Sequence, residues 1–158
     1  MKTAVKISIV ALFSALCAIL TYFTKIPSPT GGYTHIGDVA IYVAALLFGS
    51  QIGGLVGLIG PVVTDLLVGY PRWYVTLIAH GLQGVIAGFA RKKNTLLQFV
   101  LTFSAGVVMS LTYFGVNIFI KGLAPAIASL FRDVFGQTLI SVIISVPLAQ
   151  AISKRIEI

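Results

Sequence analysis

Long apolar segments, separated by short polar stretches, constrain this chain more than any other feature of its sequence. The first segment, residues 4–23, holds one charged residue, Lys6, and a helix of about 20 residues spans about 30 Å of hydrocarbon. The apolar segments do not alternate with a period of two, which excludes the strands of an outer-membrane barrel. Only 9% of the residues are charged, against about 25% in soluble domains. The sequence therefore predicts an all-α integral membrane protein.

We expect one membrane domain over residues 1–158 with six transmembrane helices. Prolines end the first helix, and Pro147 is a candidate kink in the last. Asp38 opens the second helix, where a carboxylate can cap free backbone N–H groups. The approximate helix ranges are 4–23, 37–49, 52–68, 73–90, 95–120 and 125–153.

The charge distribution predicts the orientation of the helices. Six spans put both termini on one side of the membrane, and that side carries seven basic residues: Lys2, Lys6, Arg91, Lys92, Lys93, Lys154 and Arg155. Basic residues are retained in cytoplasmic loops, so we predict cytoplasmic N- and C-termini. We interpret the net charge of +7 as a sign of topology, since no RNA-binding motif accompanies it. We expect no nucleic-acid partner.

Residues 25–38, with the sequence KIPSPTGGYTHIGD, form the longest polar interval, and the predicted topology puts them outside the cell. Pro27 and Pro29 stiffen one side of this loop, whereas Gly31 and Gly32 permit the backbone conformations that movement needs. We interpret the loop as a hinged lid over a small-molecule site. An ordinary connector with the same residues is the alternative.

Ionisable residues inside membrane spans are candidates for function, because burying them in lipid is expensive. Asp65, His80 and Arg132 lie in the outer half of their predicted helices, at a depth that the loop could cover. The alternative is internal pairing, of Asp65 with Arg72 or His80, or of Arg132 with the neighbours of Asp133. The two interpretations are compatible.

Aromatic residues gather at the same side, and we interpret most of them as an interfacial belt. Tyr33, Trp73 and Tyr74 differ, because they flank glycine or proline turns beside charges and could stack on a flat heterocycle. Asn117 offers both a donor and an acceptor. The predicted binding set is Gly32, Tyr33, His35, Asp65, Arg72, Trp73, Tyr74, His80, Asn117 and Arg132.

Small residues four apart let helices approach closely in lipid. The pairs Gly53 and Gly57, and Gly84 and Gly88, have this spacing, and internal packing is their expected role. The sequence holds no HExxH zinc signature, GxSxG elbow or phosphate-binding glycine pattern. We therefore expect no enzyme activity, no catalytic residue, no cofactor and no metal.

Several motifs resemble one known family. They are AxxxA at Ala11 and Ala15, GD at Gly37-Asp38, AALLFG at residues 44–49 and DLLVGY at residues 65–70. Together they resemble the substrate-binding S component of energy-coupling factor (ECF) vitamin transporters, in the riboflavin-, hydroxymethylpyrimidine- and pyridoxine-type branch. The resemblance covers essentially the whole chain, most weakly after Lys121.

The resemblance implies a mechanism in the bacterial cell membrane. An S component binds a vitamin outside under its first loop, then docks onto a transmembrane T component with two cytoplasmic ATPases and topples to release the vitamin inward. Ala11 and Ala15 match the docking motif, and ATP hydrolysis would belong to the partner subunits.

One departure bears on the substrate. Many relatives have a lysine where this chain has His80, and a histidine can be neutral, which suggests a less anionic ligand. We expect a small aromatic B-vitamin or precursor, hydroxymethylpyrimidine or pyridoxine first and riboflavin next. The rival is a stand-alone pore or a structural membrane protein. A pore should show a polar stripe from face to face, whereas the polar side chains here concentrate in the outer half.

Overall fold

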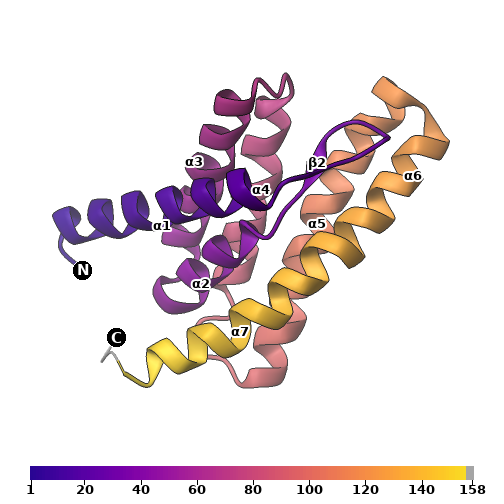
Figure 1. Cartoon of the computed structure of the whole chain (residues 1–158). Coiled ribbons are helices and arrows are strands. Elements are labelled where there is room, and N and C mark those ends of the chain that lie inside the picture. Colours follow the sequence, from indigo (N-terminus) through magenta and orange to yellow (C-terminus); the bar gives the residue numbers. More distant parts are fainter. Residues whose placement is uncertain (156–158) are drawn as a thin grey trace.

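A computed structural model describes residues 1–155, which fold into a helical bundle with one short hairpin (Figure 1). Four helical runs in these residues are long and apolar enough to cross a membrane, and α2 is a shorter apolar helix. The length and apolar composition of these helices confirm the predicted all-α membrane fold. The helices are α1 (Thr3–Thr24), α2 (Asp38–Phe48), α3 (Ser50–Val68), α4 (Trp73–Gly88), α5 (Thr95–Lys121), α6 (Leu123–Phe131), η1 (Arg132–Thr138) and α7 (Leu139–Ser153). Their limits lie within two residues of the predicted ones, with α6, η1 and α7 forming the last run.

Helices α3 and α4 pack backbone to backbone. A Cβ built on Gly53 would lie 2.5 Å from the carbonyl oxygen of Gly84, and one on Gly57 would overlap the carbonyl group of His80. A Cβ on Gly88 would overlap the backbone of Ser50. The predicted packing role of these glycines is confirmed, because no side chain fits where they meet.

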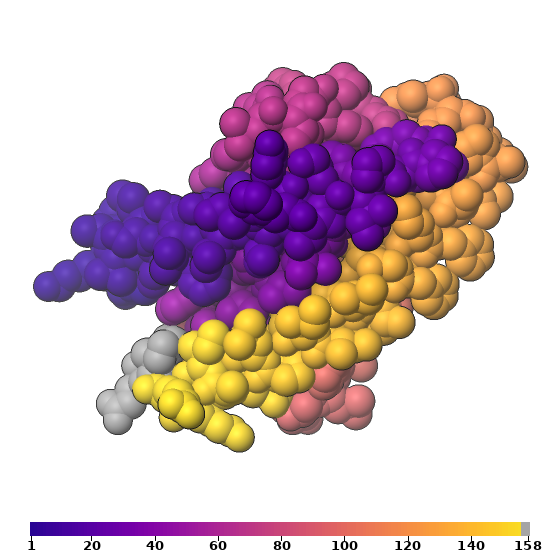
Figure 2. Space-filling view, viewed as in Figure 1, coloured from indigo at the N-terminus to yellow at the C-terminus, as the bar shows by residue number. Residues whose placement is uncertain are grey.

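Helix α1 crosses the bundle, and its N-terminal half projects from the body of the molecule (Figures 1 and 2). Its buried side consists of Val10, Ser14, Cys17, Ala18 and Thr21. Ala11 and Ala15 are exposed.

Helix α2 is buried along almost its whole length, from Asp38 to Leu47. The prediction that Asp38 caps this helix with its side chain is wrong. The first turn is closed by backbone bonds instead, from the N–H of Val39 to the Ile36 carbonyl and from the N–H of Ala40 to the Gly37 carbonyl. The Asp38 carboxylate is thereby left to accept hydrogen bonds from other helices.

The last run departs from α-helical geometry at η1, a π-helical segment, and passes Pro147 within α7 without interruption. In an α-helix two residues five apart point in clearly different directions. Hydrogen bonds from i to i+5 widen the turn. Arg132 and Gln137 therefore both reach the same cavity.

The segment between α1 and α2 forms a hairpin. Strand β1 (Ile26–Pro27) pairs antiparallel with β2 (Tyr33–Thr34), with Ile26 opposite Thr34. Gly31 and Gly32 form the turn with φ angles of 80° and 81°, which side chains rarely permit. The hairpin extends from the end of α1 toward α6 (Figures 1 and 2).

Candidate functional site

A cavity of about 40 Å³ lies beneath the hairpin, between α3, α4, α5 and η1. Of the predicted binding set, Gly32, Tyr33, His35, Asp65, His80, Asn117 and Arg132 line it. The prediction did not include its other lining residues: Gly31, Pro61, Tyr70, Thr76, Met109, Tyr113, Lys121, Asp133 and Gln137.

Five aromatic rings follow one another along this cavity. Their order is Tyr70, Tyr33, His35, His80 and Tyr113, and the centroids of successive rings lie 5.7, 5.6, 5.9 and 5.9 Å apart. Such an arc offers edges and faces to a flat heterocycle. Tyr113 stands four residues before Asn117 on the same helix and shares its face.

Tyr33 ties the hairpin to α3 by donating its hydroxyl proton to Asp65 Oδ1. Burial raises the pKa of Tyr33, so the phenol keeps the proton that it donates. Asp65 is only 2% exposed. Among the described residues the two ion pairs are His80 with Asp38 and Arg132 with Asp133, so the alternative pairing of Asp65 with Arg72 or His80 is wrong.

Hydrogen bonds of polar groups at the ends of side chains hold the other side of the hairpin. Lys121 Nζ donates to the Gly31 carbonyl at 3.2 Å, and the hydroxyls of Thr30 and Ser129 lie 2.9 Å apart. Thr34 Oγ1 donates to Gln137 Oε1 at 3.3 Å. The hairpin thus bridges α3 on one side and α5, α6 and η1 on the other.

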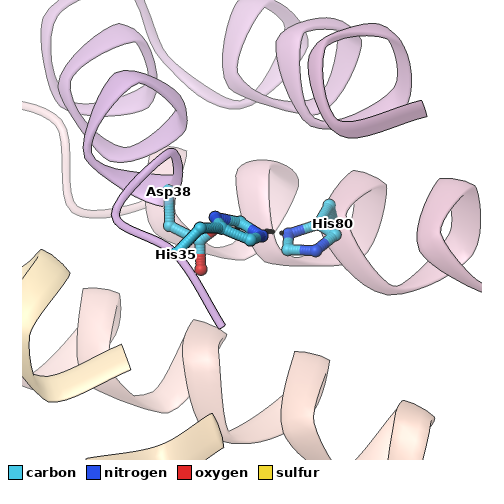
Figure 3. Close-up of side chains that lie close together, drawn as sticks. All are labelled: His35, Asp38 and His80. Atoms are coloured by element: carbon cyan, nitrogen blue, oxygen red, sulfur yellow. Dashed lines mark ion pairs between the residues drawn. The ribbon is translucent and has the colours of Figure 1, made fainter. Parts of the chain in front are cut away.

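A buried polar network lies beside the cavity, centred on the Asp38 carboxylate, which is fully buried. Its Oδ2 accepts from Gln83 Nε2 at 3.0 Å and from Gln137 Nε2 at 2.9 Å. His80 Nδ1 lies 2.7 Å from Gln83 Oε1 and 3.3 Å from Asp38 Oδ1 (Figure 3). Gln83 also donates to the Tyr42 hydroxyl at 2.8 Å. The network joins α2, α4 and η1, and sequence spacing alone gives no sign of it.

His35, Asp38 and His80 offer possible metal-ligand atoms within 4.8 Å of one another (Figure 3). However, the backbone N–H of Gly37 donates to His35 Nδ1 at 3.1 Å, so the ring proton must sit on Nε2. A metal-binding histidine uses one nitrogen for the metal and donates from the other, which His35 cannot do here. Burial also lowers the pKa of His35 to about 4, so the ring is neutral at physiological pH. The residues present do not fit a metal site.

Arg132 pairs with its neighbour Asp133, because Nε and Nη2 both donate to Asp133 Oδ1, at 2.8 and 2.7 Å. Arg72 does not line the cavity, and its Nη1 donates to Asn117 Oδ1 at 2.8 Å. Trp73 and Tyr74 do not line the cavity and are 43% and 51% exposed. They sit at the start of α4, and their exposure suits the interfacial belt rather than a binding wall.

Comparison with known proteins identifies the family. Residues 1–156 match the family described as the S component of ECF-type riboflavin transporters. The chain is 33% identical to the thiamine precursor transporter HmpT of Lactococcus lactis subsp. cremoris, over 99% of this chain and 90% of that protein. It is 35% identical to an uncharacterised protein of Pyrococcus woesei, over 87% of this chain and 95% of that one. Its fold is similar to that of ThiT from Listeria monocytogenes, with a TM-score of 0.75 over 98% of both chains and 16% identity. The chain therefore belongs to the family of ECF-type vitamin transporter S components, as its sequence motifs imply.

Proposed function

We propose that this chain captures a small aromatic B-vitamin or vitamin precursor outside the cell and delivers it inward. A T component and two ATPases would drive the delivery. The observation that carries this proposal is the ring-lined cavity beneath the hairpin, with a buried carboxylate and a guanidinium in its wall. Flat rings and a few convergent polar groups are what a heterocycle-binding site needs.

Hydroxymethylpyrimidine is the proposed substrate, with pyridoxine second and riboflavin third. The relative HmpT, which matches nearly the full length of this chain, is named as a thiamine precursor transporter. The cavity of about 40 Å³ supports the same order. A single ring requires a smaller rearrangement of the hairpin and side chains than the three fused rings of riboflavin.

The proposed ligand contacts are Gly32, Tyr33, His35, Asp65, His80, Asn117 and Arg132. Arg72 would act through Asn117, which it orients. Asp65→Ala and Arg132→Ala should weaken binding without loss of the fold. Unchanged affinity by calorimetry in both variants would remove the two residues from the site.

For docking, we propose cytoplasmic termini and a contact of the T component with Ala11 and Ala15. Both alanines are exposed on a helix that projects from the bundle, which leaves their face open to another helix. Ala11→Trp and Ala15→Trp should block uptake and leave vitamin binding intact. Normal uptake by both variants would refute the docking assignment.

A stand-alone pore is less well supported. Beyond the Asp38 and Gln83 layer, the bundle is filled by a cluster of apolar side chains that includes Leu46, Ala105 and Val146. Buried hydroxyls at this depth, such as those of Thr102 and Ser145, donate to carbonyl groups of their own helices. The distribution therefore favours a pocket that opens on one side.

A thermal-shift panel on the purified protein tests the proposed substrate. A ligand at 100 times its Kd should stabilise the fold by about 2.7 kcal/mol. Hydroxymethylpyrimidine should give the largest shift among hydroxymethylpyrimidine, pyridoxine, thiamine and riboflavin. A shift with riboflavin alone would reverse the proposed order, and no shift with any vitamin would contradict the proposed function.

A further inference from the structure

A second hollow lies where α5 begins and α7 ends, at the other end of these helices from the hairpin (Figure 1). The turn before α5 and the end of α2 complete its wall. Its volume is about 410 Å³, and it shares no lining residue with the cavity of about 40 Å³ beneath the hairpin. Ligand pockets have volumes of about 300–1,000 Å³. This hollow is therefore large enough to hold a ligand without rearrangement.

Four basic residues and no acidic residue line this hollow, which we call the basic hollow. The bases are Arg91, Lys92 and Lys93 in the turn before α5 and Lys154 after α7. Neither of the two ion pairs in the part of the chain that the structure describes involves any of them. Several unpaired positive charges around one concave surface raise the local concentration of anions. The basic hollow therefore suits an anionic ligand.

Uncharged donors between α5 and α7 add to the basic side chains. Gln150 Nε2 donates to Thr95 Oγ1 at 3.0 Å and to Gln98 Oε1 at 2.9 Å. Both partners accept through oxygen, so among the described residues the Thr95 hydroxyl proton and the Gln98 amide N–H groups stay available to a ligand. Asn94 is the N-cap of α5, and it lines the hollow together with Thr95. The positive end of the helix dipole therefore lies at the same place.

Lys92 has a backbone conformation that favours glycine. Its φ angle is 60°, and it is the one non-glycine residue with a positive φ among the described residues. A hydrogen bond from the N–H of Lys93 to the Ala90 carbonyl, at 3.1 Å, closes the turn around it. Glycine adopts this conformation without the steric cost that a side chain brings. The turn thus has a basic side chain where the backbone alone would prefer none.

The position of the basic hollow favours a lipid over a soluble anion. Thr95 begins one helix of membrane-spanning length and Ser153 ends another. The hollow therefore lies where lipid headgroups meet the hydrocarbon. Its buried lining residues, Leu46, Leu47 and Ala149, are apolar. An apolar floor under a basic rim can receive both the glycerol ester region and the phosphate of a phospholipid, whereas inorganic phosphate has no apolar part.

We propose that the basic hollow binds the phosphate group of an anionic phospholipid. Arg91 offers the planar pair of donors that suits two phosphate oxygens, and Lys92, Lys93 and Lys154 supply further positive charge. The bound lipid would connect the turn before α5 to the end of α7. Topology requires only that basic residues lie on one side of the membrane, whereas this site requires them around one concave surface. The proposal is independent of the vitamin that the chain binds.

Native mass spectrometry of the purified full chain in detergent tests the proposal. The probes are dioleoylphosphatidylglycerol, dioleoylphosphatidylcholine with the same acyl chains, and inorganic phosphate. One phosphatidylglycerol should bind about tenfold more tightly than phosphatidylcholine, because its headgroup is anionic. Inorganic phosphate at the same concentration should leave the bound lipid in place.

Two double variants separate a site from a general effect of charge. Arg91→Gln with Lys154→Gln should weaken phosphatidylglycerol binding by about tenfold to thirtyfold, because each base near an anionic headgroup contributes about fivefold. Lys2→Gln with Arg155→Gln is the matched control. It removes the same charge, but neither residue lines the hollow, and the loss should stay below about threefold.

Lys92→Gly tests the turn itself. It removes one charge and relieves the unfavourable backbone conformation. Phosphatidylglycerol binding should fall by about fivefold, while the melting temperature without lipid stays the same or rises. This combination shows that the loss of lipid does not come from a loss of folding.

The outcomes decide between the lipid site and its rivals. Equal affinities for the two lipids, or equal losses in the two double variants, would overturn the proposal, because the bases would then act through topology alone. Displacement of the lipid by equimolar inorganic phosphate would point to a soluble anion instead. Binding of a hexaglutamate peptide without phosphatidylglycerol would indicate a protein-docking surface and would also overturn it. Vitamin binding should be unchanged in every variant, so the proposed function stands or fails separately.

Discussion

The contact between α3 and α4 and the contact between the hairpin and α5–η1 are built in opposite ways. The first is a contact of backbones, in which glycines leave no space for a side chain. The second is a contact of side-chain tips, such as Lys121 with Gly31 and Thr30 with Ser129. Closely packed backbones have one arrangement, whereas a polar group at the end of a flexible side chain, such as the exposed amine of Lys121, can exchange its partner for water at little cost. The comparison indicates a fixed frame on one side of the cavity and an adjustable roof above it.

Filling the backbone contact should have the largest effect. In Gly84→Leu the new side chain would overlap the backbone of Gly53, and we expect a loss of more than about 3 kcal/mol and little folded protein. Gly115→Leu on α5 is the matched control, because nothing lies within 4 Å of its added Cβ. Size-exclusion profiles and melting temperatures in detergent measure both. A stable Gly84→Leu protein would show that the frame is not fixed.

The Asp38 network joins the frame to η1, and breaking it should have the next largest effect. Asp38→Ala removes the acceptor for two buried amides and the partner of His80, so we expect a loss of about 3 kcal/mol. Asp38→Asn keeps one acceptor oxygen and should lose less. Thermal unfolding compares the two, and equal melting temperatures for Asp38→Ala and the parent protein would contradict the role of the network.

Acid should weaken the structure next to the roof through His35. Its pKa is about 4 in the folded protein and about 6.5 in an unfolded chain. Between these values the unfolded chain binds a proton that the folded protein does not, so stability falls as the pH drops below about 6.5. The loss should reach about 2 kcal/mol by pH 5. Melting temperatures of the parent protein and of His35→Asn across pH 4–7 isolate the contribution of His35, because His80 is present in both proteins. If the two melting temperatures fall in parallel with pH, His35 does not cause the loss.

Loosening the roof should have the smallest effect on the fold. Lys121→Met removes the donor to the Gly31 carbonyl and the Ser129 hydroxyl, at a cost of about 1 kcal/mol or less. Hydrogen exchange should nevertheless speed up at the backbone amides of Ser28 and Gly31, whose bonds lie within the hairpin. Lys25→Met is the control, because the amine of Lys25 donates to the Tyr22 carbonyl on α1 and not to the hairpin turn. If both variants exchange alike, Lys121 does not hold the roof.

The frame could be predicted from sequence more fully than the roof. Apolar runs and helix-breaking residues give the helix limits, and glycines four apart give the α3–α4 contact, because both signals are local and periodic. Asp65 and His80 could be found because an ionisable residue within an apolar span stands out.

The remaining site residues depend on how helices are rotated. Trp73 and Tyr74 have suitable chemistry but lie outside the cavity, whereas Tyr113 lines it and reads as one more interfacial aromatic. Gln137 shares a wall with Arg132 only because η1 has a π-helical turn. Asp38 lies at the start of a helix, where capping residues are common. Only the tertiary structure shows that its partners are Gln83 and Gln137.

The size of the cavity has a consequence for the rate at which a ligand arrives. A volume of about 40 Å³ holds a few water molecules, and ligand pockets are generally about 300 Å³ or more. Entry must therefore follow a fluctuation of the hairpin, and the apparent Kd equals the intrinsic Kd divided by the fraction of molecules that are open. At high ligand concentration the observed association rate should level off at the opening rate instead of rising linearly. Lys121 and Tyr33, which hold the hairpin down, would then govern how fast a ligand enters as well as how long it is retained.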